Sequence, residues 1–280
     1  IDWTVSLFFS PCTLQVSMKV NISYGRLLMF NDLISKFEIR DSILILIPHE
    51  VVDDELLILI SHGSGGPGEA ETAMSNFFLS HGYTVGIVDY FTKHNVKKLF
   101  WSDRPAYKDA YEATFNEMFD IAIPNYKKVV HIGFSLGGTL GLVNSTKFTK
   151  NYCFYPGTVG MTQELLDQDY SNTTVIIAQN DIWCSDYREF ASQCKRPPRK
   201  WVAKDCYHGF MIPGKEKTIP IVKYVTTENV LSWGQFNTLG PNHEVLKSYF
   251  DYTWLTIKLL YNEKECIMYM NKILKECQSL

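Results

Sequence analysis

The sequence lacks an excess of basic residues, and it lacks any apolar run long enough to cross a membrane. It has 27 lysines and arginines and 30 acidic residues, which gives a net charge of −3. This balance lacks the excess of positive charge that is typical of nucleic-acid-binding proteins. The longest apolar runs, Ile43–Ile47 and Leu56–Ile60, have the length of strands, whereas a membrane-spanning helix needs about 18 residues or more. We therefore expect no nucleic-acid partner and no membrane span.

The cysteines lack a regular spacing. The seven cysteines are odd in number and lack the spacing of a disulfide framework, so they fit reduced thiols of a cytoplasmic protein. The histidines at 49, 81 and 94 show no metal-ligand spacing with one another or with the cysteines, which predicts no metal site.

No internal repeat, low-complexity tract or flexible linker divides the chain, so we expect a single domain over residues 18–280. Met18 is a candidate start, and we expect residues 1–17 to be a non-native or disordered extension. Two long irregular stretches, near 91–107 and 211–242, are expected to be insertions. Both are rich in aromatic residues, which favours an ordered cap over a pocket.

Short apolar runs alternate with helix-like segments along the rest of the chain. This pattern predicts an α/β protein with a mostly parallel central sheet, covered by helices on both faces, and with a hairpin at one edge. We expect strands at 36–40, 43–47, 56–60, 85–88, 127–132, 153–155, 175–178 and 200–203, and helices at 69–79, 108–119, 185–194, 244–260 and 263–277.

The most informative motif is Gly-Phe-Ser-Leu-Gly at 133–137, which follows the apolar run Val129–Ile132 and precedes a helix-like segment. In a nucleophile elbow, serine lies on a strained turn between strand and helix, with its hydroxyl exposed at the carboxyl end of a sheet. The helix that follows presents free N–H groups to a developing oxyanion. The context therefore predicts Ser135 as a nucleophile.

A serine nucleophile needs a histidine base, which in turn needs a carboxylate, and in this kind of sheet the chain order is serine, acid, histidine. Only His208 and His243 lie downstream of Ser135, and His208 follows the last predicted strand, so we take it as the base. Asp181 comes directly after the strand at 175–178 and is the expected acid, with Asp186 as the alternative.

The transition state also needs N–H donors for its oxyanion. The N–H of Leu136, directly after the nucleophile, is one expected donor. The second is expected from the loop after the strand at 56–60, with Ser64 first and Gly63 or Gly65 next. A plain strand-to-helix turn is the alternative interpretation of this loop. His131, on the elbow strand, is expected in the core, and Cys206 is expected to be structural.

With these residues in place, the chain resembles the dienelactone hydrolase family of the α/β-hydrolases. The resemblance covers roughly residues 40–262 and rests on the His62-Gly63 loop, the elbow at Ser135, Tyr155-Pro156-Gly157, and the Tyr-His-Gly-Phe segment 207–210. It implies an eight-stranded sheet and hydrolysis of an ester or lactone through an acyl-enzyme.

The chain departs from the family at two positions. The family has cysteine as nucleophile where this chain has Ser135, and glutamate after the loop histidine where this chain has Gly63. A serine with a histidine base does not need that glutamate, so the two changes go together.

We therefore expect a serine hydrolase acting on a small-molecule carboxylic ester or lactone, with no metal or organic cofactor. The alternatives are a peptidase of the prolyl-oligopeptidase type, an acyltransferase, and a ligand sensor with slow or no turnover. The sequence carries no signal for an oligomeric state.

Overall fold

The computed structural model describes residues 30, 32–40, 42–94, 113–117, 125–158, 161–181, 187–224 and 252–280. Its main strands are β1 (Ile34–Arg40), β2 (Ile43–Pro48), β3 (Leu56–Ser61), β4 (Thr84–Val88), β5 (Lys128–Phe134), β6 (Lys150–Phe154), β7 (Thr173–Ala178) and β8 (Arg199–Ala203). The helices are α2 (Glu69–Ser80), α4 (Leu136–Val143), α5 (Gln163–Asp167), α6 (Tyr187–Gln193) and α9 (Glu263–Cys277), with short 3₁₀ turns η2 (Thr92–His94) and η5 (Ser145–Lys147).

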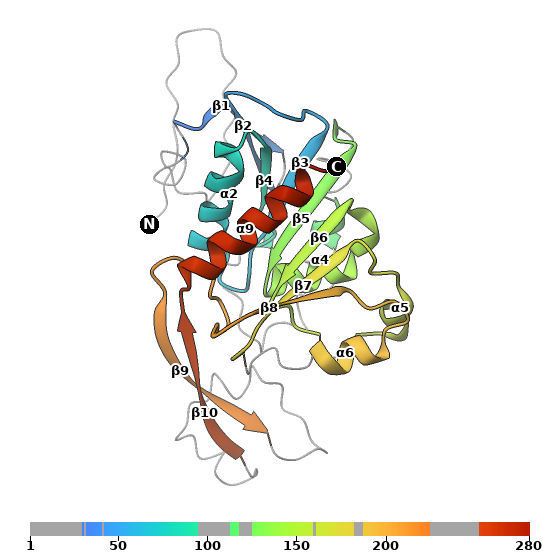
Figure 1. Ribbon diagram of the computed structural model, residues 1–280, viewed down its shortest axis with the longest axis vertical. Coiled ribbons are helices and arrows are strands. Elements are labelled where there is room, and N and C mark those ends of the chain that lie inside the picture. Colours follow the sequence, from blue (N-terminus) through green and yellow to red (C-terminus); the bar gives the residue numbers. More distant parts are fainter. Residues whose placement is uncertain are drawn as a thin grey trace.

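These strands form one eight-stranded sheet in the order β1-β2-β4-β3-β5-β6-β7-β8 (Figure 1). β1 and β2 make an antiparallel edge hairpin, and β2 runs antiparallel to β4. From β4 to β8 every neighbouring pair is parallel. This is the α/β-hydrolase fold, so the predicted fold class, the edge hairpin and the eight strands are confirmed.

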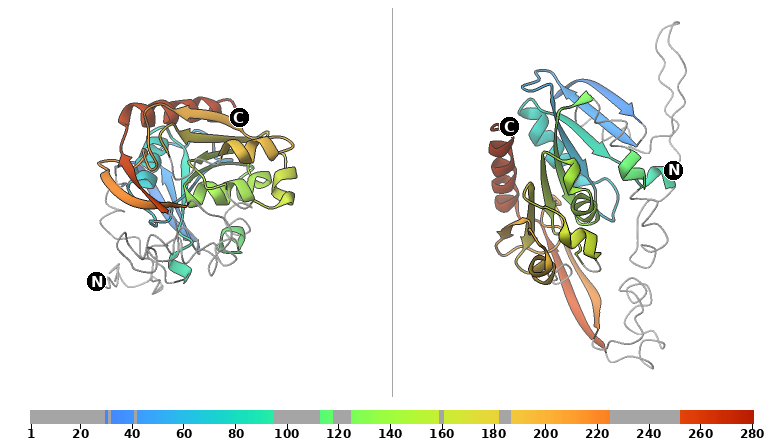
Figure 2. Two further views of the ribbon diagram at one scale, coloured as in Figure 1. Left: turned by 90° about the horizontal axis from the view of Figure 1, so that it is seen from below. Right: turned by 90° about the vertical axis from the view of Figure 1, so that its right-hand side faces the viewer.

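Alternate residues of the central strands face two separate helical layers, because successive side chains of a strand point to opposite faces. Ile58 and Ile60 of β3 lie in a core shared with α2 and α9, whereas Leu57 and Leu59 pack with α4 on the other face. Figure 2 shows α9 on one side of the sheet and α4 on the other. Every residue of β3 is buried, as expected of the central strand of a covered parallel sheet.

The helices of the first face are delimited by local signals. Asn262 caps α9 by accepting a hydrogen bond from the Glu265 amide (3.2 Å), and two glutamates lie in its first turn, where they favour the helix dipole. At the start of α2, the Glu71 carboxylate accepts a hydrogen bond from the Gly68 amide at 2.6 Å. The helices predicted at 69–79 and 263–277 are therefore confirmed with nearly the predicted bounds.

The region after β8 differs from the prediction. Residues Glu216–Tyr224 form strand β9, and Tyr252–Leu260 form β10, which pairs with it antiparallel in a two-stranded ribbon. The ribbon projects from the end of the sheet (Figures 1 and 2). The helix predicted over 244–260 is thus wrong for its last nine residues, and part of the irregular stretch 211–242 is a strand. Residues 225–251 lie outside the described chain.

Other predictions are covered only in part. Residues 113–117 are helical within the helix predicted at 108–119, and η2 occupies the start of the insertion predicted near 91–107. Residues 1–17 and 95–107 lie outside the described residues, so the single domain over 18–280 and the N-terminal extension stay predictions. Among the described helices, none is long and apolar enough to cross a membrane.

Candidate active site

Ser135 lies at the turn between β5 and α4, as the Gly-Phe-Ser-Leu-Gly motif predicts. Its φ of 51° and ψ of −108° put it in a backbone conformation that non-glycine residues rarely adopt. A hydrogen bond from its amide to the Phe154 carbonyl (2.9 Å) ties the turn to the end of β6. Strain of this kind persists only where the surrounding structure enforces it, and it is concentrated at functional sites.

The turn requires glycine on both sides of Ser135, because backbone atoms already occupy the space that a side chain there would fill. A Cβ at Gly133 would lie 2.4 Å from the Gly137 carbonyl oxygen, and a Cβ at Gly137 would lie 2.4 Å from that of Ser61. The second contact brings the elbow helix directly against β3. The sheet edge that carries Ser135 and the loop after β3 are therefore packed as one unit.

The structure brings together Ser135, His208 and Asp181, which are far apart in sequence. The Nε2 atom of His208 lies 3.2 Å from the Ser135 hydroxyl, and its Nδ1 atom lies 2.8 Å from Oδ2 of Asp181. His208 and Asp181 are both buried. Since a carboxylate only accepts hydrogen bonds, Nδ1 carries the hydrogen, which leaves Nε2 to accept the proton of the serine hydroxyl.

The loops that present this acid and base are closed by short backbone hydrogen bonds. Asp181 follows β7 in a turn where its amide donates to the Ala178 carbonyl (3.1 Å). The Asn180 amide donates to the Cys206 carbonyl (2.8 Å), which joins the two loops two residues before His208. Asp205 (φ 53°) and Gly209 (φ 72°) flank the histidine with left-handed backbone.

The ring of Tyr155 packs against the imidazole of His208, a contact that the sequence did not predict. It follows β6 with a φ of 39°, is buried, and its ring centroid lies 4.7 Å from that of the His208 imidazole. Phe210, also buried, meets the tyrosine ring in an edge-to-face contact, with the ring centroids 5.7 Å apart. The described non-glycine residues with positive φ are Ser135, Tyr155 and Asp205, so the strained backbone is concentrated around this group.

The Tyr-Pro-Gly segment is also tied to the elbow helix. The Thr139 hydroxyl, in the first turn of α4, lies 3.0 Å from both the amide and the carbonyl oxygen of Gly157. These contacts tie the segment 155–157 to the start of the elbow helix, and the same segment supplies the tyrosine ring that packs against His208.

The loop after β3 lies beside Ser135, where the second oxyanion donor is predicted. A Cβ at Gly63 would lie 3.4 Å from Cβ of Ser135. The Gly66 amide donates to the Gly63 carbonyl (3.1 Å) and closes a tight turn over 63–66. Leu136 begins α4, so its N–H has no partner within the helix. A Cβ added at Gly65, in the same loop, would have no atom within 4 Å among those it could meet.

His131 lies in the core, as predicted, and forms a closed polar network behind the elbow. Its Nε2 lies 2.7 Å from the Ser61 hydroxyl and its Nδ1 lies 2.8 Å from Oδ1 of Asn151. The Asn151 amide donates in turn to the Gly141 carbonyl of α4 (2.9 Å). Burial lowers the pKa of His131 to about 4, so this side chain is neutral and structural near pH 7.

Other candidates from the sequence either lack the properties of a reacting group or lie outside the described residues. Burial raises the pKa of the Cys206 thiol to about 12, the opposite of the shift that activates a cysteine nucleophile. His243 and Asp186 lie outside the described residues. No group of three or more metal-ligating side chains occurs within the described ranges.

Comparison with known proteins gives fold-level likenesses. No family model matches the chain, and no curated protein matches it. Among solved structures, a predicted CIB-like hydrolase from Thermoplasma acidophilum is 14% identical and has a TM-score of 0.48, over 64% of this chain and 91% of its own. An α/β serine hydrolase without a lid from Xanthomonas campestris is 13% identical with a TM-score of 0.48, over 64% and 87%.

A dienelactone hydrolase-like promiscuous phosphotriesterase from metagenomic libraries is also similar. It is 13% identical with a TM-score of 0.46, over 60% of this chain and 77% of its own.

Proposed function

We propose that this protein is a serine hydrolase that cleaves a carboxylic ester or lactone through an acyl-enzyme. The observation that carries the proposal is the continuous chain of contacts from the Ser135 hydroxyl through His208 to Asp181, at 3.2 Å and 2.8 Å. These are the distances over which a base takes a proton from a nucleophile and a carboxylate orients that base.

In the proposed reaction the Ser135 oxygen attacks the carbonyl carbon of the substrate, and its proton passes to Nε2 of His208. Asp181 holds the imidazole in the required tautomer and stabilises the imidazolium that forms. The tetrahedral intermediate collapses when the bond to the leaving oxygen breaks and His208 protonates that oxygen. Water, deprotonated by His208, then attacks the acyl-serine, and the serine oxygen leaves and regains its proton.

The negative charge of the tetrahedral intermediate requires donors held in place before the reaction, and each contributes a few kcal/mol. We assign the N–H of Leu136 and the N–H of Ser64 to this role, with Gly63 and Gly65 as neighbouring donors. The proposed mechanism uses the side chains and amides of this chain and draws on no metal or organic cofactor.

The substrate class follows from the site and from the resemblance. The Tyr155-Pro156-Gly157 and Tyr207–Phe210 segments favour the dienelactone hydrolase type. The serine at 135 and the glycine at 63 make a general ester or lactone a better candidate than dienelactone itself. A peptidase, an acyltransferase and a slow ligand sensor are the competing functions that the experiment below separates.

The test is labelling with a fluorophosphonate, which reacts with activated serines, followed by peptide mapping. We expect an adduct on Ser135 in the wild type and none in Ser135→Ala or His208→Ala. Ser192→Ala removes an exposed hydroxyl whose hydrogen bond among the described residues goes to the Glu189 carbonyl of α6. This variant is the matched control and should label like the wild type. A folded wild type that resists labelling contradicts the proposal.

Substrate panels then separate the competing functions. Hydrolysis of p-nitrophenyl acetate and of a simple lactone supports the ester hydrolase, and a preference for a prolyl anilide supports the peptidase. Product transferred to methanol in preference to water supports the acyltransferase. Saturable lactone binding without product supports the sensor. We further propose a reducing, cytoplasmic setting, since the described cysteines, 153, 194, 206, 266 and 277, are free thiols.

A further inference from the structure

A third buried histidine, besides His208 and His131, lies next to the proposed oxyanion hole. His62 follows β3 and has no exposed surface. Its ring stacks on Tyr90 (centroids 4.0 Å apart) and meets the edge of Phe91 at 4.5 Å. Tyr90 and Phe91 follow β4, which is one neighbour of β3, whereas Ser135 follows β5, the neighbour on the opposite side. The imidazole of His62 therefore lies on the side of its loop that faces away from the elbow.

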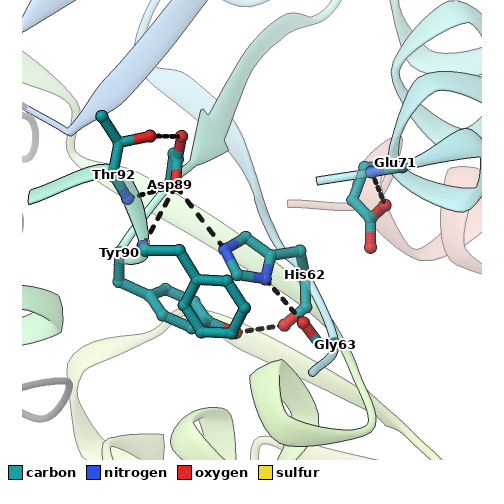
Figure 3. Close-up of polar contacts among 8 residues, drawn as sticks. His62, Gly63, Glu71, Asp89, Tyr90 and Thr92 are labelled. Atoms are coloured by element: carbon teal, nitrogen blue, oxygen red, sulfur yellow. Dashed lines mark hydrogen bonds and ion pairs between the residues drawn. The ribbon is translucent and has the colours of Figure 1, made fainter. Parts of the chain in front are cut away.

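Two successive carbonyl groups of the loop are held by side-chain donors (Figure 3). The Nδ1 atom of His62 lies 2.7 Å from the Gly63 carbonyl oxygen, so Nδ1 carries the hydrogen and donates it. The Tyr90 hydroxyl donates to the carbonyl of His62 itself. Since the Gly66 amide also donates to the Gly63 carbonyl at 3.1 Å, that oxygen is fixed by two donors.

The orientation of these carbonyls fixes the orientation of the N–H groups. In a trans peptide unit the C=O and the N–H point in opposite directions. The Gly63 carbonyl shares its peptide unit with the Ser64 N–H, and the His62 carbonyl shares its unit with the Gly63 N–H. Holding the Gly63 oxygen on the His62 ring therefore turns the Ser64 N–H away from that ring and toward the β5 side, where Ser135 lies.

The other ring nitrogen makes no comparable contact. Nε2 of His62 has no hydrogen-bond partner among the described residues and lies 3.9 Å from Oδ1 of Asp89. That carboxylate is already bonded to the Phe91 and Thr92 amides and to the Thr92 hydroxyl. Burial lowers the pKa of His62 to about 4, so near pH 7 the ring is neutral with its single hydrogen on Nδ1.

We infer that His62 is a positioning residue for the oxyanion hole, acting through its Nδ1–H on the Gly63 carbonyl so that the Ser64 N–H faces the reacting carbonyl. The inference rests on the proposed function, because it assigns the means by which the proposed hole is held open. It predicts that His62 contributes to transition-state binding and leaves ground-state binding of the substrate nearly unchanged.

Three variants separate the donor from the ring. His62→Phe keeps an aromatic ring against Tyr90 but has no donor. His62→Asn places an amide nitrogen where Nδ1 lies and restores a donor. Tyr90→Phe removes only the hydroxyl that holds the His62 carbonyl. Each is compared with the wild type for kcat and KM on p-nitrophenyl acetate, for inhibition by a trifluoromethyl ketone, and for its thermal midpoint.

Loss of a whole oxyanion donor costs about 10²–10³-fold in kcat, and a misdirected donor should cost part of that. We expect His62→Phe to lower kcat by about 10–100-fold with KM changed less than about threefold, and to weaken the trifluoromethyl ketone, which forms an oxyanion, by a similar factor. His62→Asn should recover most of kcat. Tyr90→Phe should lose about 3–10-fold. The pH profile of kcat, which reports the His208 base, should keep its midpoint in all three.

The outcomes are distinguishable. An active wild type with a His62→Phe variant of equal kcat overturns this inference and leaves the proposed function standing. A loss in His62→Phe that appears only in KM, or that Asn does not recover, also overturns it. If His62→Phe does not fold, Tyr90→Phe and His62→Asn decide the matter by the same kcat and inhibitor measurements. A wild type that neither hydrolyses esters nor labels at Ser135 refutes the proposed function, and this inference falls with it.

Discussion

Replacing Gly137 by alanine tests whether the elbow and the oxyanion loop form one packed unit. A Cβ at this position would lie 2.4 Å from the Ser61 carbonyl oxygen and 2.8 Å from that of His62. The first of these is about 1 Å short of the ordinary contact distance of 3.4 Å. Both partners are backbone atoms, so no side chain can rotate away, and either β3 or the start of α4 must move by about that amount.

The expected cost follows from this displacement. Forcing a methyl group into a packed core costs about 1–3 kcal/mol, and a misplacement of about 1 Å at reacting groups costs about 10²-fold in rate. We therefore expect Gly137→Ala to lower the free energy of unfolding by about 1–3 kcal/mol and kcat/KM for p-nitrophenyl acetate by about 10²-fold. Urea unfolding followed by tryptophan fluorescence and steady-state kinetics measure the two quantities.

A matched control comes from the neighbouring loop. Gly65 has no atom within 4 Å of its added Cβ and no left-handed φ, so Gly65→Ala should leave stability unchanged or raise it by up to about 1 kcal/mol. Only stability is compared for this control, because Gly65 lies beside the proposed oxyanion donors. A Gly137→Ala variant as stable and active as the wild type refutes the argument, and so does a Gly65→Ala variant destabilised as strongly.

Three further predictions concern the acid, the buried histidines and a helix cap. Asp181→Asn should lower kcat by about 10⁴-fold while the chain stays folded; near-normal turnover in single-turnover assays would exclude Asp181 as the orienting acid. Burial lowers the pKa of His62 and His131 from 6.5 to about 4, so the native state binds fewer protons than the unfolded state. Stability should therefore fall by about 3 kcal/mol per histidine as pH drops from about 6.5 to 4; constant urea midpoints over that range would contradict this. Asn262→Ala should cost about 1 kcal/mol by removing the cap of α9, whereas Asn262→Asp should retain most of it in thermal unfolding.

The sequence predicts the main sheet well because its strands are short apolar runs bounded by turn residues. It fails at Tyr252–Leu260, where Tyr-Thr-Trp-Leu-Thr-Ile-Lys-Leu-Leu has apolar residues at both helical and strand spacing. What decides the outcome is pairing with Glu216–Tyr224, whose paired residues lie 28 to 44 positions earlier in the chain. A local pattern cannot identify such a partner. β propensity depends on such cross-strand neighbours more than on the residue itself.

The candidate site, too, has residues that the sequence predicts and contacts that it does not. Ser135, Asp181 and His208 are found from chain order and strand ends, because parallel strands bring their carboxyl ends to one edge of the sheet. The ring of Tyr155 beneath His208 and the bond from His62 to the Gly63 carbonyl depend on side-chain directions across different strands. The sequence marks both residues as parts of motifs, but it does not indicate what they touch.

The ribbon of β9 and β10 has a consequence for how this chain can evolve. Its two ends are fastened to each other: the Tyr261 amide donates to the Lys215 carbonyl (2.8 Å), and the Asn262 amide donates to the Phe210 carbonyl (3.1 Å). The polypeptide therefore leaves the body and re-enters it at nearly the same point. Lengthening, shortening or exchanging the segment 216–260 leaves those anchoring bonds in place, and added loop length costs little entropy. Selection can thus remodel this appendage while the sheet and the proposed catalytic residues are inherited unaltered.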